Sequence, residues 1–177
     1  MNNMKQAVTI KPYDSKMPDY FKREKGFLNK NLGNGFEIQH VGSSAVPGLG
    51  GKNVLDIQLL APNKSVAKKT VKKLESVGYV QNKDAGDEYR IFFNRNRSFD
   101  DRKIHIHLHL MWKTADKYKE QLMFMDYLRE HPEEAERYFS LKKVLARKAG
   151  DKREKYTEAK TDYIKSVLEK ARKEFKL

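Results

Sequence analysis

The sequence is most restrictive in what it lacks: it has no cysteine, one tryptophan and five prolines in 177 residues. The absence of cysteine rules out a disulfide framework and fits a reducing compartment. No apolar run approaches the roughly 20 residues that a membrane-spanning helix needs. The N-terminal stretch 1–11 is polar and does not resemble a secretory signal. Together these absences predict a cytoplasmic protein with no membrane partner.

The charge is strongly basic, with 37 Lys and Arg against 24 Asp and Glu, a net charge of +13. Residues 1–112 carry a net charge of +8 and residues 113–177 carry +5, so the excess is not confined to a tail. A solvated, lysine-rich surface is one interpretation. A face that binds RNA or nucleotide phosphates is the other. No motif indicates a protein that reads DNA sequence.

The most informative segment reads as a strand, a small-residue turn and a second strand. Residues 36–41 alternate in polarity, and Gly42-Ser43-Ser44 then interrupts the strand. Small residues let backbone N–H groups approach an anion, and hydroxyl groups can add hydrogen bonds. Residues 54–60 are apolar except for Asp56 and Gln58, which share one strand face. An acid in a buried strand requires a partner or a cation, so this arrangement suggests metal–nucleotide chemistry.

The same residues carry a family resemblance. Residues 40–58, HVGSSAVPGLGGKNVLDIQ, resemble the signature of the GrpB family. Further similar segments are Tyr89–Phe93, His107–Leu110, Phe124–Pro132, Leu141-Lys142 and the Tyr156…Lys160 pair. That family is placed in the nucleotidyltransferase superfamily, so the resemblance implies a nucleotidyltransferase-like α+β fold. It also implies a phosphate-binding Gly-Ser turn, a pair of acids and a third acid on a nearby strand.

The chain departs from that pattern at two places. Gln58 stands where the second acid would be, and imidazoles at His105, His107 and His109 replace a carboxylate at the third position. Two-metal phosphoryl transfer needs several anionic oxygens around two hard cations. One acid, one amide and histidines make a poor Mg²⁺ pair. They leave two alternatives: a single divalent metal at Asp56, His107 and His109, with His105 outside the motif, or a metal-free polar pocket.

Each candidate site residue also has a structural interpretation. Asp56 is either the catalytic or metal-binding acid, or a buried acid that hydrogen-bonds or pairs with neighbouring groups. Gln58 either orients Asp56 or has a structural role. Candidates for phosphate or nucleotide contact are His40, Gly42, Ser43, Ser44, Lys52 and Arg90. The serines could instead cap a turn, and the two cations could pair with acids.

The organisation predicted for the chain is a nucleotidyltransferase-like core over residues 1–112 and a C-terminal helical section over 113–177, packed on the same domain. Hydrophobic spacing predicts helices over 17–32 and from Asn63 to Gly78. It predicts strands over 36–41, 54–60, 88–93 and 103–111, with a charged hairpin loop over 94–102. Beyond residue 114 the spacing is helical, with Pro132 opening one helix and Asp151 capping one long final helix.

Two functions of different class follow. The first is a nucleotidyltransferase-like enzyme that binds a nucleoside triphosphate with a divalent metal at Asp56. The second is a catalytically degenerate module that binds a nucleotide, a coenzyme or RNA, which the missing second acid favours. The acceptor and substrate are left open.

Overall fold

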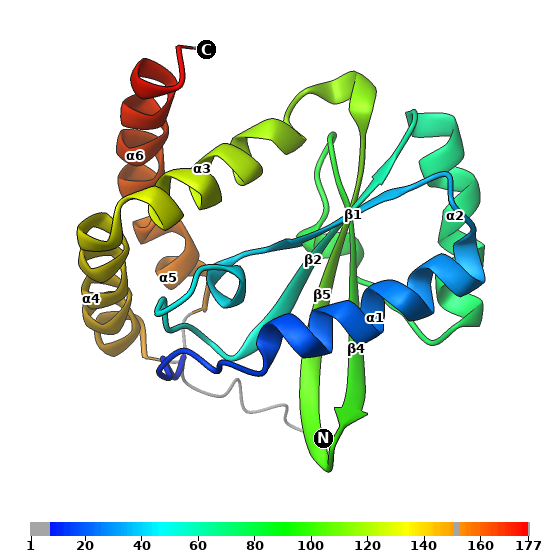
Figure 1. Cartoon of the computed structure of the whole chain (residues 1–177), viewed down its shortest axis with the longest axis horizontal. Coiled ribbons are helices and arrows are strands. Elements are labelled where there is room, and N and C mark those ends of the chain that lie inside the picture. Colours follow the sequence, from blue (N-terminus) through cyan, green and yellow to red (C-terminus); the bar gives the residue numbers. More distant parts are fainter. Residues whose placement is uncertain (1–7, 151–152, 177) are drawn as a thin grey trace.

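A five-stranded mixed sheet forms the centre of the computed structural model, which describes residues 8–150 and 153–176 (Figure 1). The strand order is β1-β2-β5-β4-β3. The strands are β1 (Glu37–Val41), β2 (Val54–Ala61), β3 (Val80–Gln81), β4 (Ile91–Phe99) and β5 (Arg102–Trp112). The central pair β2–β5 is parallel, and the other neighbours are antiparallel. The expected α+β architecture is therefore confirmed.

One face of this sheet is apolar and is covered by helices α1 (Met17–Leu32) and α2 (Lys64–Ser76). Side chains alternate along a strand, so every second residue of β2 and β5 points to this face. Those residues form one buried cluster with both helices: Leu55, Ile57, Leu59, Ile104, Ile106, Leu108 and Leu110. The residues between them are polar and point to the opposite face.

Both covering helices have the ends that the sequence predicts. The side chain of Asn63 caps α2 by accepting a hydrogen bond from the Val66 N–H at 3.0 Å. Beyond the other end of α2, Gly78 has φ +93°, a conformation that glycine adopts without strain. Helix α1 carries Pro18 in its first turn and ends before Gly33, as predicted.

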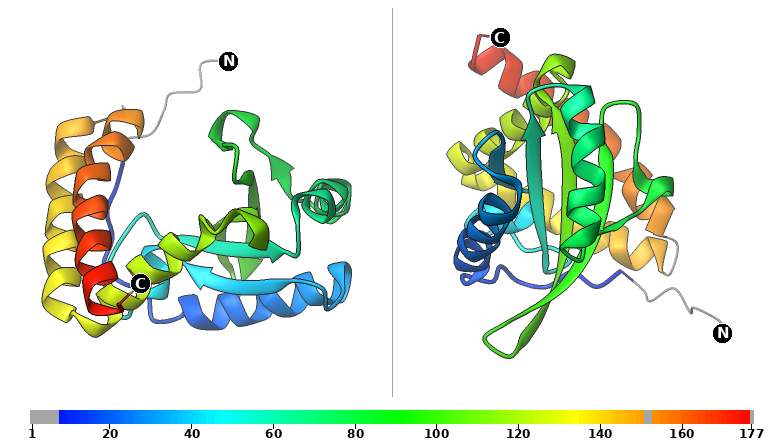
Figure 2. Two further views of the ribbon diagram at one scale, coloured as in Figure 1. Left: turned by 90° about the horizontal axis from the view of Figure 1, so that it is seen from above. Right: turned by 90° about the vertical axis from the view of Figure 1, so that its right-hand side faces the viewer.

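The C-terminal part is helical and builds a second core. Its helices are α3 (Tyr118–Glu130), α4 (Pro132–Ala149), α5 (Arg153–Ala159) and α6 (Thr161–Glu174). Figure 2 shows α4 and α6 standing side by side, on the side of the molecule away from α2. Buried residues of α3, α4 and α6 meet the loop Ala45–Leu49 in this core. Pro132 opens α4 as predicted.

Three sequence predictions are wrong, one in the helical section and two in the sheet. The final helix is not continuous, because it is divided at Lys160 into α5 and α6; the predicted cap, Asp151, lies outside the described residues. The segment 94–102 is not a loop: β4 runs to Phe99 and β5 starts at Arg102, so only Asp100 and Asp101 turn the chain. The strand predicted over 88–93 starts at Ile91.

The long hairpin is strand because its arginines have a buried partner. Glu24 of α1 is fully buried, and its carboxylate accepts hydrogen bonds from Arg95 at 3.1 Å, from Arg97 and from the Tyr79 hydroxyl at 2.7 Å. A buried carboxylate needs such partners to offset the loss of its hydration. The charges that suggested a loop therefore anchor β4 to α1. The tip of this hairpin extends beyond the rest of the sheet (Figure 2).

None of the helices described here is long and apolar enough to cross a bilayer.

Candidate functional site

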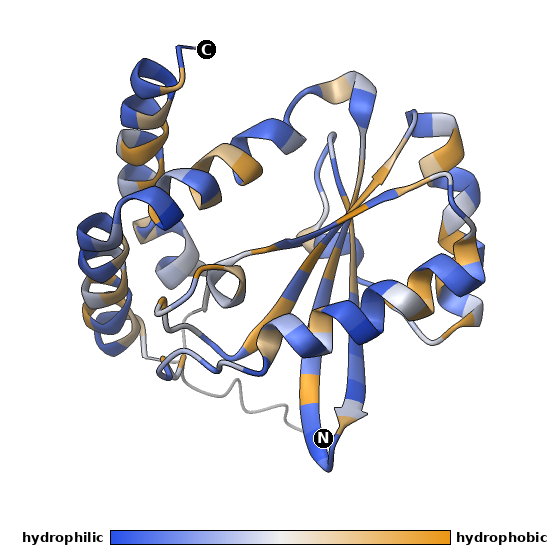
Figure 3. Ribbon diagram, in the orientation of Figure 1, coloured by the Kyte–Doolittle hydropathy of each residue, from blue (hydrophilic) through white to orange (hydrophobic). Residues whose placement is uncertain are grey.

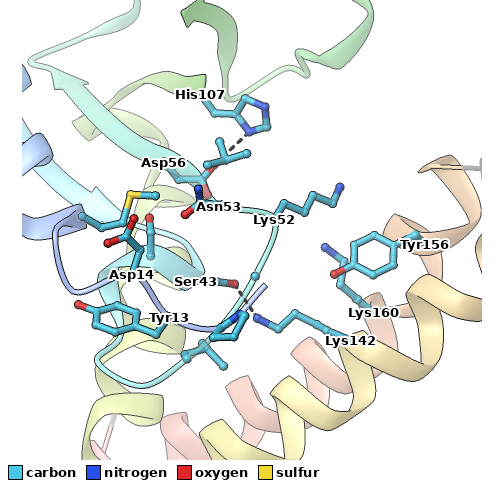
Figure 4. A pocket seen from close by; sticks show the side chains of 16 residues that line it. Tyr13, Asp14, Ser43, Lys52, Asn53, Asp56, His107, Lys142, Tyr156 and Lys160 are labelled. Atoms are coloured by element: carbon cyan, nitrogen blue, oxygen red, sulfur yellow. Dashed lines mark hydrogen bonds and ion pairs between the residues drawn. The ribbon is translucent and has the colours of Figure 1, made fainter. Parts of the chain in front are cut away.

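The polar face of the sheet borders a cleft with two lobes. The first lobe has a volume of about 150 Å³ and the second about 400 Å³. Both are lined by Ser43, Leu49, Asp56 and Lys160, so they are parts of one continuous site. The sheet and its Gly-Ser turn provide one wall, and α4 with the α5–α6 junction provides the other (Figure 4). The site therefore joins the two sections of the chain.

Asp56 lies at the centre of the cleft because β2 pairs in parallel with β5, which sets Asp56 beside His107. His107 Nδ1 lies 3.1 Å from Asp56 Oδ1, and His109 Nε2 lies 3.6 Å from the same oxygen. Burial alone would raise the pKa of the Asp56 carboxyl, but its interactions with His107 and His109 outweigh that effect and hold the pKa below its usual range. Burial lowers the pKa of His109. Asp56 is therefore an anion at pH 7.

The Gly-Ser turn approaches Asp56 so closely that only glycine fits. Gly42 has φ +71°, and a Cβ added there would lie 2.3 Å from Asp56 Oδ2. The next residue, Ser43, starts a short 3₁₀ turn, Ser43–Ala45, and borders both lobes. Ser44 borders the first lobe and is mostly buried. The predicted cradle is thus adjacent to the acid.

A group of lysines from the helical section faces this acid. The amine of Lys142 in α4 donates hydrogen bonds to Ser43 Oγ at 2.8 Å and to the Gly50 carbonyl. Lys160 lies at the α5–α6 junction and borders both lobes. Lys52, from the loop before β2, and Lys160 both lie over the Tyr156 ring, at 4.7 and 4.5 Å from its centre.

Burial makes two of these amines weak bases. Burial lowers the pKa of Lys142 to about 7, with the neighbouring Lys160 charge acting in the same direction. Burial and the charge of Lys52 lower the pKa of Lys160 to about 8. The Asp56 carboxylate opposes both shifts but does not cancel them. The other acids on the cleft walls, Asp14, Asp87 and Glu120, already pair with basic side chains, so Asp56 is the carboxylate that faces these amines.

Sequence reasoning did not assign Lys142 and Lys160 to the site. Both were visible as part of the family resemblance, but their helices were interpreted as apolar stripes. The available signal was periodic: Lys142 lies four residues after Tyr138 and four before Ala146, on a buried stripe. A lysine on such a stripe is unusual, because a charged side chain is seldom fully buried without a partner.

Three predicted residues lie beside the cleft without lining it. Gln58 is fully buried beneath the second lobe, where its amide N–H group donates to Gln121 Oε1 at 3.1 Å and to the Tyr118 carbonyl at 3.3 Å. His40 lies behind the turn, with its Nε2 at 3.0 Å from Ser44 Oγ. His105 meets Asn96 Oδ1 at 2.8 Å instead of Asp56. Burial lowers the pKa of His40 to about 4, so its ring is neutral at pH 7.

Arg90 borders the second lobe, and its partners are protein groups. It pairs with Asp87 at 3.1 Å, donates to the Ala85 carbonyl at 3.0 Å, and lies 3.3 Å from His109 Nδ1. Its Nε is buried without a hydrogen-bond partner. The rest of this lobe is mainly apolar, with these side chains on its walls: Met111, Phe124, Met125, Tyr138, Ile164 and Leu168.

The donor set does not fit a pair of metal ions. Asp56 is the one carboxylate at the junction of the lobes, and Gln58 in the second acidic position is buried and holds α3. Among residues 8–150 and 153–176, no three His, Cys, Asp or Glu side chains are grouped so as to hold a metal ion. A two-metal reaction therefore lacks its ligands here.

Comparison with known structures identifies the class of fold. The structure matches the Cid1 poly(U) polymerase bound to MgATP with a TM-score of 0.51 at 9% identity, over 77% of this chain and 43% of that one. At that identity the match shows a nucleotidyltransferase-like fold and nothing further. A crystal structure of the conserved protein GrpB from Enterococcus faecalis matches more fully, with a TM-score of 0.80, 25% identity, and coverage of 96% and 100%.

Sequence comparison identifies the family. The GrpB protein family matches residues 7–170, so the chain belongs to the GrpB family. UPF0157 protein PA4798 of Pseudomonas aeruginosa is 35% identical over 167 residues, which cover 93% of this chain and 67% of that protein. UPF0157 protein BH1888 of Halalkalibacterium halodurans is 29% identical, with coverage of 93% and 83%. The family resemblance of the 40–58 motif is thereby confirmed.

Proposed function

We propose that this GrpB protein binds a nucleotide, or another ligand with a polyphosphate group, in the two-lobed cleft. The observation that carries the proposal is the set of three lysines, Lys52, Lys142 and Lys160, that line the first lobe with Ser43 and Asp56. Lys142 is buried and Lys160 is half-buried, and an anion that enters beside them offsets the cost of their lost hydration. A cytoplasmic location, where nucleotides are abundant, stays a prediction.

The phosphates belong in the first lobe. The Ser43 hydroxyl and the amines of Lys142 and Lys160 are hydrogen-bond donors on facing walls, and a phosphate oxygen between them would accept from both. Gly42 lets the turn lie against Asp56 without a side chain in the way. Binding an anion raises the pKa of both amines, because their charged forms gain a partner. Ligand binding should therefore take up protons between pH 7 and 8.

The organic part of the ligand belongs in the second lobe. Its volume of about 400 Å³ and its apolar walls suit a flat ring system such as a nucleobase. Arg90 borders this lobe, with its guanidinium held by Asp87 and the Ala85 carbonyl.

Of the two functions, binding and catalysis, catalysis is the less favoured. Gln58 carries no charge and is committed to Gln121 and Tyr118, so it supplies no second metal ligand. The geometry therefore supports a module that retains the nucleotide site and has lost two-metal transfer. A coenzyme with a diphosphate would meet the same donors. The single-metal hypothesis, with Asp56, His107 and His109 as ligands, stays a prediction that the experiment below tests, since these three described side chains are not grouped as a metal site without an ion.

The test is calorimetric titration with ATP, GTP and CTP, in EDTA, at pH 6.5 and pH 8.5. We expect binding at pH 6.5 that weakens about tenfold or more at pH 8.5, as Lys142 and Lys160 lose their protons with pKa values of about 7 and 8. The variant K160M should bind weakly at both pH values. Its matched control is K148M, which removes an exposed lysine from α4 outside the cleft.

Metal dependence is tested in the same titrations with Mg²⁺, Mn²⁺ and Zn²⁺. If a metal binds at Asp56, it tightens nucleotide binding to the wild type and not to D56N. Pyrophosphate release is assayed in parallel, and we expect none with Mg²⁺. Rapid release would show that the missing acid matters less than argued here. No binding of any nucleotide under any of these conditions would refute the proposed function.

A further inference from the structure

The basic charge of this protein gathers on the side of the sheet opposite the cleft. Helices α1 and α2 together carry nine Lys and Arg against three Asp and Glu, a net charge of +6 in 29 residues. Helices α3 to α6 carry thirteen against eleven, a net charge of +2 in 52 residues. The even distribution along the sequence therefore conceals an uneven distribution in space.

The arrangement of charges on α2 destabilises the helix. Its five lysines include 64, 68 and 72, one helical turn apart on one row, and 69 and 73 on the adjacent row. Like charges at this spacing repel each other. The first turn holds Lys64 and no acid, whereas the positive end of a helix dipole favours acids there. A sequence that breaks these local rules usually does so for function.

Acids neutralise little of this face, where Arg23 of α1 pairs with Asp100 at 2.8 Å. Lys68, Lys69, Lys72 and Lys73 are exposed and form no ion pair with any residue that the structure describes. Of the three acids in the two helices, Glu24 is buried and bound to the arginines of β4. The helices on the other side differ, because the acids Glu120, Asp126 and Glu134 all pair with basic side chains there.

The same face lacks what a protein or a lipid bilayer would need. The large apolar side chains exposed in the described part of the chain are Val80, Tyr89 and Val144, and none belongs to α1 or α2. Protein interfaces have aromatic and arginine anchors at their centre and are depleted in lysine. Helices that lie on a membrane insert apolar side chains. Figure 3 shows the blue, hydrophilic segments that dominate both helices.

We propose that the lysine face of α1 and α2 binds the phosphate backbone of a nucleic-acid duplex, without reading its sequence. Lysines on one row of α2 are spaced about 6 Å apart, since a helix rises about 1.5 Å per residue. A duplex carries roughly one negative charge per 1.7 Å, so each lysine meets a phosphate wherever the helix lies along the backbone. The surface is separate from the cleft, so the inference does not depend on the proposed function.

The experiment measures fluorescence anisotropy of a labelled 20-base-pair RNA duplex between 50 and 200 mM KCl. For four lysine–phosphate contacts, the slope of log K against log [salt] should be about −4. The variant K68E/K69E/K72E/K73E should lose at least tenfold in affinity at 50 mM KCl and flatten the slope. Glu has nearly the helix propensity of Lys, and circular dichroism checks that α2 is retained. An unlabelled DNA duplex should compete, because no base edge is read.

The matched control is R147E/K148E/K165E/K173E, which makes the same change in net charge at exposed positions of α4 and α6. The control should lose much less affinity than the α2 variant. Equal losses would overturn the proposal, because they would show a response to net charge alone. Binding to phosphatidylserine vesicles but not to the duplex would overturn it too. Nucleotide titrations of the α2 variant should match the wild type, which separates this surface from the cleft.

Discussion

Replacing Lys142 by methionine should stabilise the ligand-free protein and weaken its ligand binding. Lys142 is 2% exposed, and the pKa of its amine, about 7, lies well below the ordinary 10.5 of lysine. At about 1.36 kcal/mol per pH unit, placing that amine in the folded protein at pH 7 costs about 5 kcal/mol. Methionine carries no charge and replaces most of the apolar stem.

The gain is reduced by the hydrogen bonds that the variant loses. The amine donates to Ser43 Oγ and to the Gly50 carbonyl, and losing a buried pair of this kind costs about 2–3 kcal/mol. The net expectation at pH 7 is therefore a variant that is about 2 kcal/mol more stable than the wild type. Nucleotide affinity should fall about 10- to 100-fold, since one charge-assisted hydrogen bond is worth about 1.5–3 kcal/mol.

The pH dependence tests the origin of this effect. Between pH 7 and 10.5 the unfolded chain binds a proton at Lys142 that the folded chain does not, so wild-type stability rises with pH in that window. The advantage of the variant should accordingly shrink by about 1.4 kcal/mol per pH unit and reverse near pH 9. Urea unfolding at pH 7, 8 and 9 measures it, with K148M as the exposed control. A variant less stable than the wild type at pH 7, with unchanged nucleotide affinity, would refute the reasoning and make Lys142 structural.

Two further substitutions test how the site and its support are held. E24Q removes the fully buried carboxylate that binds Arg95 and Arg97, and urea unfolding should show that the free energy of unfolding falls by about 3–5 kcal/mol. The control is E75Q, at an exposed position. A fall below about 1 kcal/mol in E24Q would contradict the argument that the pair is buried. G42A places a Cβ 2.3 Å from Asp56 Oδ2 at φ +71°, so it should abolish nucleotide binding. G48A, at φ +78° with no atom within 4 Å, bears the same backbone strain alone and should still bind; equal binding by both variants would show that the close approach is unimportant.

The elements that the sequence predicts well are those governed by local chemistry. The helix over 17–32, the Asn63 cap and the pairing of the histidine strand with the Asp56 strand all follow from periodicity and the family motif. The prediction of a loop over 94–102 was wrong, because Glu24, some 70 residues earlier, makes the arginines of this segment compatible with a strand. The division at Lys160 was missed because an apolar stripe continues across it.

The candidate site likewise contains residues that the sequence predicts and residues that it does not. Asp56, Gly42 and Ser43 lie within one short motif and were identified from it. Lys142 and Lys160 meet that motif only through tertiary contacts between sections nearly 100 residues apart, as in the Lys142–Ser43 hydrogen bond. The proposed role of these two lysines depends on the burial of their amines. Hydrophobic periodicity indicates which face of a helix is buried, but it does not indicate whether one amine on that face is buried.

The seam between the sheet and the helical section has a consequence for how the molecule opens. Its helical side carries two amines, Lys142 and Lys160, that lose hydration at this contact, whereas the cores on either side are apolar, so the seam is the less stable contact. Cooperative units that are weakly joined separate locally at a lower free energy than global unfolding. Amide hydrogen exchange in α4 and α6 should therefore be faster than in β2 and β5. A polyanion in the cleft should slow it, since a ligand that bridges both walls holds the two units together.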